Sequence, residues 1–234
     1  MREAIVVKNL NFSYENSNFK LQNINFVIYE RENIGIIGKN GSGKTTLILN
    51  LVGILKGDGL IKIFDIPLKK ENLKEIRKKV QIVFQNPDDQ LFSPTVFDDI
   101  SFGLLNLGLK EDEVMKRVDD VLKDINMVQY KNYFPNHLSF GEKKKISIAT
   151  ILSMRPEIII FDEPTQGLDP KSRREIIEII KKIDGTKIIV SHDLDMIYNL
   201  CSKIILLYNG KIISFDDKDK ILKDKKLLEE CELI

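Results

Sequence analysis

The sequence has no tryptophan, and it has only two cysteines and two histidines among its 234 residues. Cys201 and Cys231 are too few for a disulfide scaffold, and they do not have the spacing of a metal site. The N-terminal segment lacks the apolar stretch of a secretory signal, and no apolar run approaches the roughly 18 residues that cross a bilayer. We therefore expect a protein of the reducing cytoplasm with no transmembrane segment of its own.

The sequence also lacks an excess of charge of either sign, since 36 Lys and Arg residues stand against 35 Asp and Glu residues, a formal net charge of +1. A chain held to nucleic acid by its overall charge would be strongly basic, so no nucleic-acid partner is expected. The local basic run Lys143-Lys144-Lys145 is predicted to be a solvated helix face.

Short apolar runs alternate with helical patterns along the chain, and this alternation is typical of an α/β sheet domain. Near-continuous β-branched runs suit strands that are covered on both faces. Buried strands are predicted at Ile34–Ile37, Ile158–Phe161, Lys187–Val190 and Ile204–Tyr208. Residues 86–155 instead favour helices, including one between about 111 and 128. We predict a single domain in which this helical subdomain is inserted into a core formed by residues 1–85 and 156–234.

The most specific motif follows the predicted strand Asn33–Ile37. It is Gly38-Lys39-Asn40-Gly41-Ser42-Gly43-Lys44-Thr45, which matches the phosphate-loop pattern G-x-x-x-x-G-K-[ST]. Glycines let successive backbone N–H groups surround phosphate oxygens, Lys44 adds a positive charge and the Thr45 hydroxyl can ligate Mg²⁺. A helix from Lys44 to about Leu51 directs its positive end at the phosphates and ends near Gly53. The motif predicts nucleotide binding, but kinases, GTPases and motors share it.

Polar residues end two of the predicted strands. Asp162 and Glu163 follow the strand Ile158–Phe161, at the edge where open α/β sheets collect ligands. Asp162 can hold Mg²⁺, and Glu163 can orient or deprotonate an attacking water. His192 follows the neighbouring strand and is interpreted as a γ-phosphate contact. Acidic residues also end strands at solvent boundaries, and a lone histidine is often structural, so these two simpler interpretations stay open here.

A capping box begins the next predicted helix, which runs from Phe140 to about Met154. Ser139 is followed three residues later by Glu142, the spacing in which each residue caps the other. The box either only caps the helix, or the Ser139 hydroxyl, the Gly141 N–H and the helix dipole form an anion site. Such a site would bind a γ-phosphate presented by another subunit.

These elements, in this order, resemble the ATP-binding subunits of ABC transporters over essentially the whole chain. The resemblance implies ATP and Mg²⁺ as ligands and an ABC-type nucleotide-binding domain with a P-loop α/β core, an inserted helical subdomain and a small antiparallel β subdomain. The phosphate loop with Thr46 resembles the Walker A motif, Asp162 and Glu163 resemble Walker B, and His192 resembles the switch histidine. The other matching positions are the Q-loop glutamine Gln85, the signature Leu138-Ser139-Phe140-Gly141-Glu142, and the D-loop Gly167-Leu168-Asp169-Pro170.

The resemblance also implies particular roles. Thr45, Gln85 and Asp162 would hold Mg²⁺, and Glu163, His192 and Gln85 would act in hydrolysis. Tyr14 resembles the aromatic residue that stacks on adenine, and its alternative is a strand residue in the core. Two positions depart from the family pattern: Phe140 stands where glycine is usual, which puts the turnover rate in doubt, and Glu142 stands where glutamine is commoner.

A closer resemblance lies in the segment after Gln85. The run Phe84-Gln85-Asn86-Pro87-Asp88-Asp89-Gln90-Leu91-Phe92, with Ser93-Pro94-Thr95-Val96 after it, is similar to energy-coupling-factor ATPases, including cobalt- and nickel-import subunits. This similarity implies a transmembrane coupling subunit and a substrate-binding membrane subunit as partners. It also implies a peripheral position on the cytoplasmic face of the cell membrane. The transported substrate, whether cobalt, nickel or a vitamin, is not written in this chain.

The chain carries one phosphate loop and one signature motif, so a signature that serves a phosphate must belong to a second chain. We therefore expect a head-to-tail pair of ATPase subunits, identical or related, around two ATP molecules.

A soluble ABC ATPase of translation or DNA maintenance would need two cassettes or a long coiled coil, and the interval from Thr45 to Ser139 is too short for the latter. A small-molecule kinase would need neither a signature helix nor His192.

Overall fold

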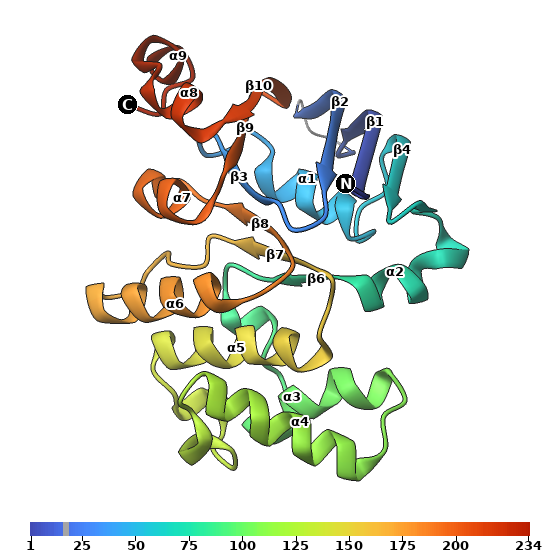
Figure 1. The fold of residues 1–234 in the computed structure, drawn as a ribbon, viewed down its shortest axis with the longest axis vertical. Helices are drawn as coiled ribbons and strands as arrows, with labels where there is room; N and C mark the ends of the chain where they lie inside the picture. The colour runs from blue at the N-terminus through green and yellow to red at the C-terminus, as the bar shows by residue number, and fades with distance from the viewer. Residues whose placement is uncertain (16–18) are drawn as a thin grey trace. The chain divides into compact units, whose positions relative to one another are not determined.

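The computed structural model describes residues 1–15 and 19–234, and these form two compact units (Figure 1). The first unit consists of Met1–Gln81, Glu157–Glu163 and Asp184–Ile234. The second unit consists of Ile82–Pro156 and Pro164–Ile183. Among the residues described, no helix is long and apolar enough to cross a membrane.

A small antiparallel sheet lies in the first unit, with strand order β2-β1-β4-β5. Its strands are β1 (Glu3–Ser13), β2 (Lys20–Tyr29), β4 (Asp58–Ile63) and β5 (Ile66–Pro67). Strand β1 pairs antiparallel with both β2 and β4, and the three strands lie side by side in Figure 1. The antiparallel β subdomain implied by the family resemblance is therefore present.

The second sheet has the strand order β10-β9-β3-β8-β7-β6. Its strands are β3 (Asn33–Ile37), β6 (Val80–Val83), β7 (Ile158–Asp162), β8 (Thr186–Val190), β9 (Lys203–Tyr208) and β10 (Lys211–Asp217). Strand β3 runs parallel to β8 and β9, and β8 runs parallel to β7. Every residue of β7 and β8 is buried, as the apolar runs predict. The four buried strands expected from the sequence are confirmed, and the carboxyl ends of β3, β7 and β8 meet at one edge.

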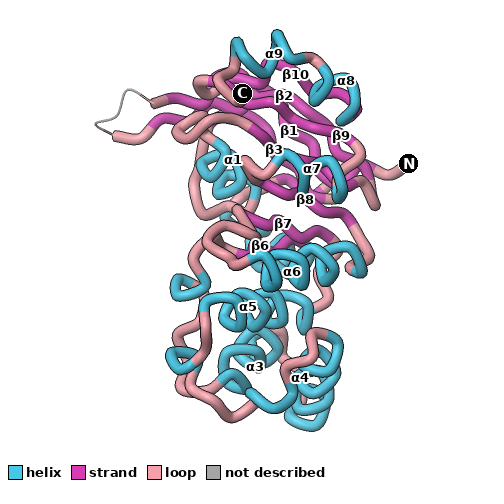
Figure 2. Tube along the Cα trace, turned by 90° about the vertical axis from the view of Figure 1, so that its left-hand side faces the viewer, coloured by secondary structure: helices cyan, strands magenta, loops and turns pink. Residues whose placement is uncertain are grey.

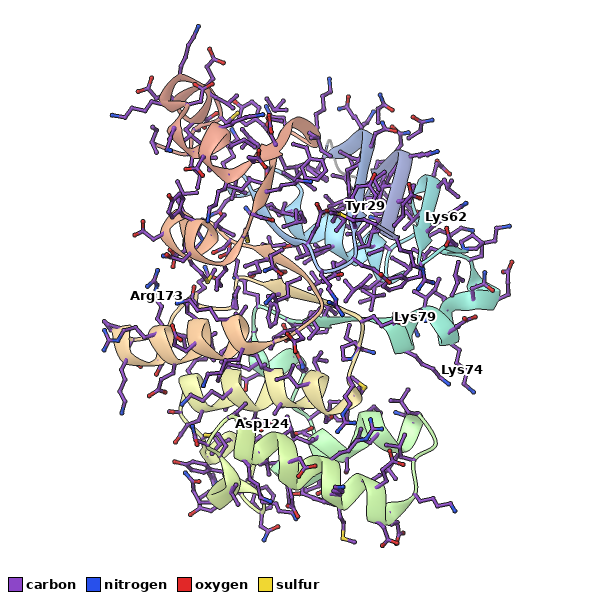
Figure 3. The ribbon with its side chains drawn as sticks, viewed as in Figure 1. Tyr29, Lys62, Lys74, Lys79, Asp124 and Arg173 are labelled. Atoms are coloured by element: carbon purple, nitrogen blue, oxygen red, sulfur yellow. The ribbon has the colours of Figure 1, made fainter. Side chains whose placement is uncertain are left out.

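The helices of the first unit are short. They are α1 (Lys44–Leu51), α2 (Leu73–Lys79, after a 3-10 turn at Lys70–Asn72), α7 (Leu194–Leu200), α8 (Lys218–Lys223) and α9 (Lys225–Glu230). Helix α1 ends at Leu51 and is followed two residues later by Gly53, whose φ of 70° suits glycine, so the predicted end of this helix is confirmed. On α2, Lys74 extends away from the ribbon into solvent (Figure 3).

The second unit is helical, and Figure 2 shows α3, α4 and α5 gathered together. Its helices are α3 (Val96–Asn106), α4 (Glu111–Asp124), α5 (Phe140–Met154) and α6 (Pro170–Lys182), and 3-10 turns lie at Pro87–Asp89, Val128–Tyr130 and Pro135–His137. The apolar stripe of α4 packs into a core with α3 and α5 that includes Val96, Ile100, Leu104, Val114, Val118, Leu122 and Ile146. The helical pattern between about 111 and 128 is therefore confirmed.

The expectation that Lys143-Lys144-Lys145 is a solvated helix face is wrong. The Lys144 side chain is fully buried, and its Nζ donates hydrogen bonds to the backbone carbonyls of Phe84 and Gln85. Lys143 Nζ lies 2.7 Å from Asp88 Oδ1, and Lys145 forms an ion pair with Glu175. Partners far away in the sequence offset the cost of burying these charges, so charge alone could not reveal their burial.

Asp99 on α3 is buried, and it holds the loop that precedes this helix. Its Oδ1 accepts hydrogen bonds from the backbone N–H groups of Phe92 at 3.0 Å and Ser93 at 2.9 Å. Burial raises the pKa of the Asp99 carboxyl, and these two N–H groups oppose the shift. The folded protein therefore binds the Asp99 proton more tightly than the unfolded chain does.

We expect Asp99→Asn to change how stability depends on pH. The stabilisation that comes from a raised carboxyl pKa is complete below the unfolded pKa and is lost as the pH rises through the folded pKa. Asparagine keeps an acceptor oxygen and does not titrate. The melting temperature of the variant minus that of the parent should therefore increase from about pH 4 to about pH 7. Asp112→Asn, an exposed control on α4, should show no such trend, and a flat difference for Asp99→Asn would contradict this account.

Candidate nucleotide site

The loop Gly38–Thr45 joins β3 to α1 in the first unit, as the motif predicts. Gly41 and Gly43 have φ values of 79° and 107°, a region that side chains rarely adopt. A Cβ at Gly43 would lie 2.5 Å from Phe19 Cζ, whereas a Cβ at Gly41 would meet nothing within 4 Å. The loop is therefore packed on one side at Gly43 and open at Gly41, as an anion-binding loop requires.

Lys44 is buried at the start of α1, and its ammonium lies over its own loop. Its Nζ donates hydrogen bonds to the carbonyl oxygens of Gly38 at 2.7 Å and Lys39 at 3.2 Å. Burial lowers the pKa of Lys44, while the nearby carboxylates of Glu163 and Asp162 oppose that shift. A buried ammonium held by neutral carbonyls suits an anionic phosphate, so this loop fits a nucleotide.

Thr45 and Asp162 converge at the carboxyl edge of the sheet. Thr45 Oγ1 donates a hydrogen bond to Asp162 Oδ2 at 3.2 Å, and Asp162 is buried at the end of β7. A hydroxyl and a carboxylate beside a phosphate loop are the hard oxygen donors that Mg²⁺ takes, so this pair fits the metal. The third expected ligand, Gln85, belongs to the second unit, and its part in the metal site stays a prediction.

Glu163 is the centre of a hydrogen-bonded group in the first unit. Its Oε2 accepts from Ser191 Oγ at 2.9 Å and from the backbone N–H of His192 at 3.4 Å, and it lies 2.9 Å from His192 Nδ1. Glu163 has a φ of 43°, and its own N–H donates to the carbonyl of Val190 on β8 at 2.9 Å. Strand β8 therefore holds the strained backbone of Glu163 in place. The Glu163 carboxylate is buried, and it lies beside the exposed imidazole of His192. This geometry suits a base that orients water.

Sequence reasoning missed Ser191, which fixes one oxygen of Glu163 from the end of β8. The available signal was its position, because it is a polar residue directly after a buried strand and beside His192. His192 has a polar partner at this edge, Glu163, and its contact with a γ-phosphate stays a prediction.

Tyr14 follows the end of β1 and is 41% exposed, so the alternative that it is a core residue of a strand is wrong. Its hydroxyl lies 3.2 Å from Thr46 Oγ1 on α1, and its ring meets Phe12 edge-on with the ring centroids 4.9 Å apart. The ring is therefore anchored to the phosphate-loop helix and still presents surface to solvent. Such a surface suits stacking on a flat base.

The predicted capping box is present in the second unit. Ser139 Oγ donates to Glu142 Oε2 at 2.7 Å and accepts from the Glu142 N–H at 3.4 Å, and the Ser139 N–H donates to Glu142 Oε2 at 2.8 Å. Hydrogen bonds from Tyr130 and then from Ser139 lower the pKa of Glu142. The Ser139 hydroxyl is directed at a carboxylate in this structure, so it must turn to donate to a phosphate.

The signature segment packs against the D-loop segment in the second unit. Asp169 caps α6 by accepting from the N–H groups of Lys171 at 2.9 Å and Ser172 at 3.1 Å. A Cβ at Gly141 would lie 2.6 Å from Ser172 Oγ, so this position needs glycine. The half-exposed ring of Phe140 lies against Gly167, 3.3 Å from where a Cβ would stand there. Phe140, the signature residue that departs from the family pattern, thus packs against the D-loop.

The exposed Gln85 side chain donates a hydrogen bond to Gln166 Oε1, a residue that sequence reasoning did not single out. Both glutamines belong to the second unit. The only hint of Gln166 in the sequence is its place between the strand-end carboxylates and the D-loop.

The phosphate loop between a parallel strand and a helix, with the carboxylates of Asp162 and Glu163 at the same edge of the sheet, defines a P-loop ATPase. The family model described as ABC transporter matches residues 21–166. A putative ABC transporter ATP-binding protein of Geobacter sulfurreducens is 44% identical over 98% of this chain and 92% of its own length. An energy-coupling factor transporter ATP-binding protein, EcfA, of Carboxydothermus hydrogenoformans is 42% identical over 98% of this chain and 86% of its own length.

Solved structures agree with this assignment. CbiO1 of Clostridium perfringens, part of the ABC transporter complex CbiONQ, matches with a TM-score of 0.85 and 36% identity over 100% of this chain and 96% of its own. A dimeric ATP-binding cassette in a post-hydrolysis state, bound to ADP and Pi, matches with a TM-score of 0.82 and 28% identity over 92% of this chain and 98% of its own. The chain belongs to the ABC transporter family, and within it this protein is an ATP-binding subunit with ATPase activity.

Proposed function

We propose that this chain is the ATP-hydrolysing subunit of an energy-coupling-factor type import system and that it drives a transmembrane partner. The name of the EcfA relative supports an energy-coupling-factor assembly, and CbiO1 is likewise part of an ABC transporter complex. They also disfavour the alternative of a soluble ABC ATPase of translation or DNA maintenance. The transported substrate would be chosen by membrane subunits.

One structural observation carries the proposed contact with a membrane subunit. Three apolar side chains shortly after Gln85 are exposed in the second unit: Phe92 by 68%, Phe102 by 51% and Leu105 by 54%. The rings of Phe92 and Phe102 meet edge-on with centroids 5.1 Å apart, and Phe102 and Leu105 are three residues apart on one face of α3. Clustered exposed apolar side chains mark interaction sites more often than solitary ones do. We call these three residues the apolar docking patch.

The proposed reaction gives each residue of the nucleotide site a role. Lys44 and the loop N–H groups bind the phosphates of ATP, and Tyr14 presents its ring to adenine. Thr45 and Asp162, with Gln85, would hold Mg²⁺, which when bound neutralises charge on the phosphates. Glu163 orients a water for attack on the γ-phosphate and accepts its proton, and His192 contacts the same phosphate.

The proposed assembly is a head-to-tail pair of ATPase subunits. Ser139, the Gly141 N–H and the positive end of α5 serve the γ-phosphate bound by the other chain, so each ATP lies between two subunits. ATP closes such a pair because only the closed state gains both sets of contacts, and hydrolysis releases it. A docked membrane subunit would follow this opening and closing, at the cytoplasmic face of the membrane.

We expect charges in the apolar docking patch to separate the ATPase from its membrane partner. The double variant Phe92→Asp/Phe102→Asp places two carboxylates where the partner would bury apolar surface. The test is affinity purification from native membranes in mild detergent, with the recovered proteins identified by mass spectrometry. The parent should recover integral membrane proteins, and the variant should recover at least about tenfold less of them. The parent and the variant should hydrolyse ATP alike when purified alone.

Met115→Asp is the matched control, since Met115 is an exposed apolar residue on α4 of the same unit. It should recover the membrane proteins as the parent does. Recovery of ribosomal or DNA-associated proteins by the parent would contradict the import function and support the soluble alternative. Equal recovery by the parent and the docking-patch variant would remove the patch from the interface.

A further inference from the structure

The strongest feature outside the nucleotide site fastens the Q-loop to helix α5. Gln90, in the 3-10 turn region after the Q-loop, bridges the two segments with both ends of its amide. Its Oε1 accepts from the Phe84 N–H at 3.1 Å. Its Nε2 donates to the Ser147 carbonyl and to Thr150 Oγ1, both at 2.7 Å. The Gln90 side chain thus accepts the hydrogen bond that the Phe84 N–H would give to a neighbouring strand in a sheet.

Lys144 holds the same stretch of backbone from helix α5 itself. It is buried within α5, and its Nζ donates to the carbonyls of Phe84, at 3.1 Å, and of Gln85. Hydrogen bonds from a charged donor are stronger than those between neutral groups. The N–H of Phe84 and the carbonyls of Phe84 and Gln85 are therefore all held by Gln90 and Lys144, the pair we call the Q-loop clamp.

A third contact extends this attachment along the helix. Lys143 Nζ lies 2.7 Å from Asp88 Oδ1, one turn before the Gln90 contacts on α5. The Gln85 side chain is exposed, in contrast to its fixed backbone. Because α5 begins at the capping box of Ser139, any displacement of the Q-loop backbone must break these bonds or move the signature helix with it.

We propose that Gln90 and Lys144 are positioning residues that act through Gln85. The clamp fixes the backbone of Gln85 to α5, so that the Q-loop glutamine and the signature move as one piece. The proposal rests on the role of Gln85 in the proposed function and adds the residues on which that role depends. It also gives a physical use to a lysine that is fully buried outside the phosphate loop.

The test is a mutant cycle on the purified protein, with kcat for ATP hydrolysis and the Kd for ATP measured for each variant. Gln90→Leu keeps the size of the side chain and removes its hydrogen bonds. It should lower kcat about tenfold and change the Kd by less than about twofold, because small displacements of a catalytic group cost rate more than binding. In the Gln85→Ala background, which is itself slow, Gln90→Leu should produce no further loss. A residue that only stabilised the fold would not depend on Gln85 in this way.

Two further variants keep the test decisive. Lys144→Gln should behave as Gln90→Leu does, and if it fails to fold, the Gln90 cycle still decides. Val118→Ala, in the core of the same unit, lowers stability without touching the Q-loop and should keep the parent's kcat. The clamp proposal is overturned if Gln90→Leu keeps the parent's kcat, or if its loss adds in full to that of Gln85→Ala. If Gln85→Ala itself is as fast as the parent, the role of Gln85 in the proposed function fails, and the clamp proposal fails with it.

Discussion

Glu163→Gln should lower the rate of ATP hydrolysis by about 10² to 10⁴-fold while ATP still binds, because the amide cannot accept the proton of the attacking water. The substitution preserves shape, and one amide oxygen can still accept the hydrogen bond from Ser191 Oγ, which lies 2.9 Å from the carboxylate in the parent. Lys44, Thr45 and Asp162 are unchanged. The variant should therefore retain the phosphate contacts and lose only the chemical step.

The loss of hydrolysis should trap the closed pair of subunits. With ATP and Mg²⁺, Glu163→Gln should elute as a dimer in size-exclusion chromatography with light scattering, while the parent returns to a monomer as ATP is consumed. Glu229→Gln, an exposed control on α9 of the same unit, should hydrolyse ATP as the parent does. Turnover of Glu163→Gln at the parent's rate would mean that another group activates the water.

The sequence predicted the parts of this fold in which neighbouring residues carry the information. The strands β3, β7 and β8 contain near-continuous apolar runs, and such a run indicates a strand covered on both faces before its neighbours in the sheet are known. The phosphate loop and the capping box at Ser139 are likewise local, since each is fixed by spacings of a few residues. Such features follow from steric and hydrogen-bond rules within one segment.

The features that escaped prediction depend on residues distant in the sequence. Lys144 looks like a surface residue because its acceptors, the carbonyls of Phe84 and Gln85, precede it by about 60 positions and are backbone groups that any residue has. Ser191 meets Glu163 only because β7 and β8 are neighbours in the sheet.

Removal of the Lys44 ammonium from the phosphate loop should have the other large effect on ATP hydrolysis. Lys44→Met keeps the unbranched apolar stem and deletes only the charge, so the burial of the side chain within the first unit is retained. The burial that lowers the pKa of Lys44 also strengthens its attraction to a phosphate, because the field of a charge is less screened there. We expect hydrolysis to fall by at least about 10²-fold and ATP affinity to fall with it.

Lys39, in the same loop, allows the effect of the Lys44 charge to be distinguished from the effect of the total charge of the loop. The Lys39 ammonium is directed away from the loop carbonyls, with its Nζ 2.7 Å from Glu232 Oε1 and 4.9 Å from the Tyr208 ring centroid. Lys39→Met should therefore cost far less ATP affinity than Lys44→Met, measured by isothermal titration in the Glu163→Gln background so that ATP is not consumed. In that background Lys44→Met should also prevent the ATP-dependent dimer, because the closed pair depends on the phosphates that Lys44 binds. Equal losses from the two lysine variants would show that the loop attracts ATP by its total charge, and the geometry of Lys44 would then not be the cause.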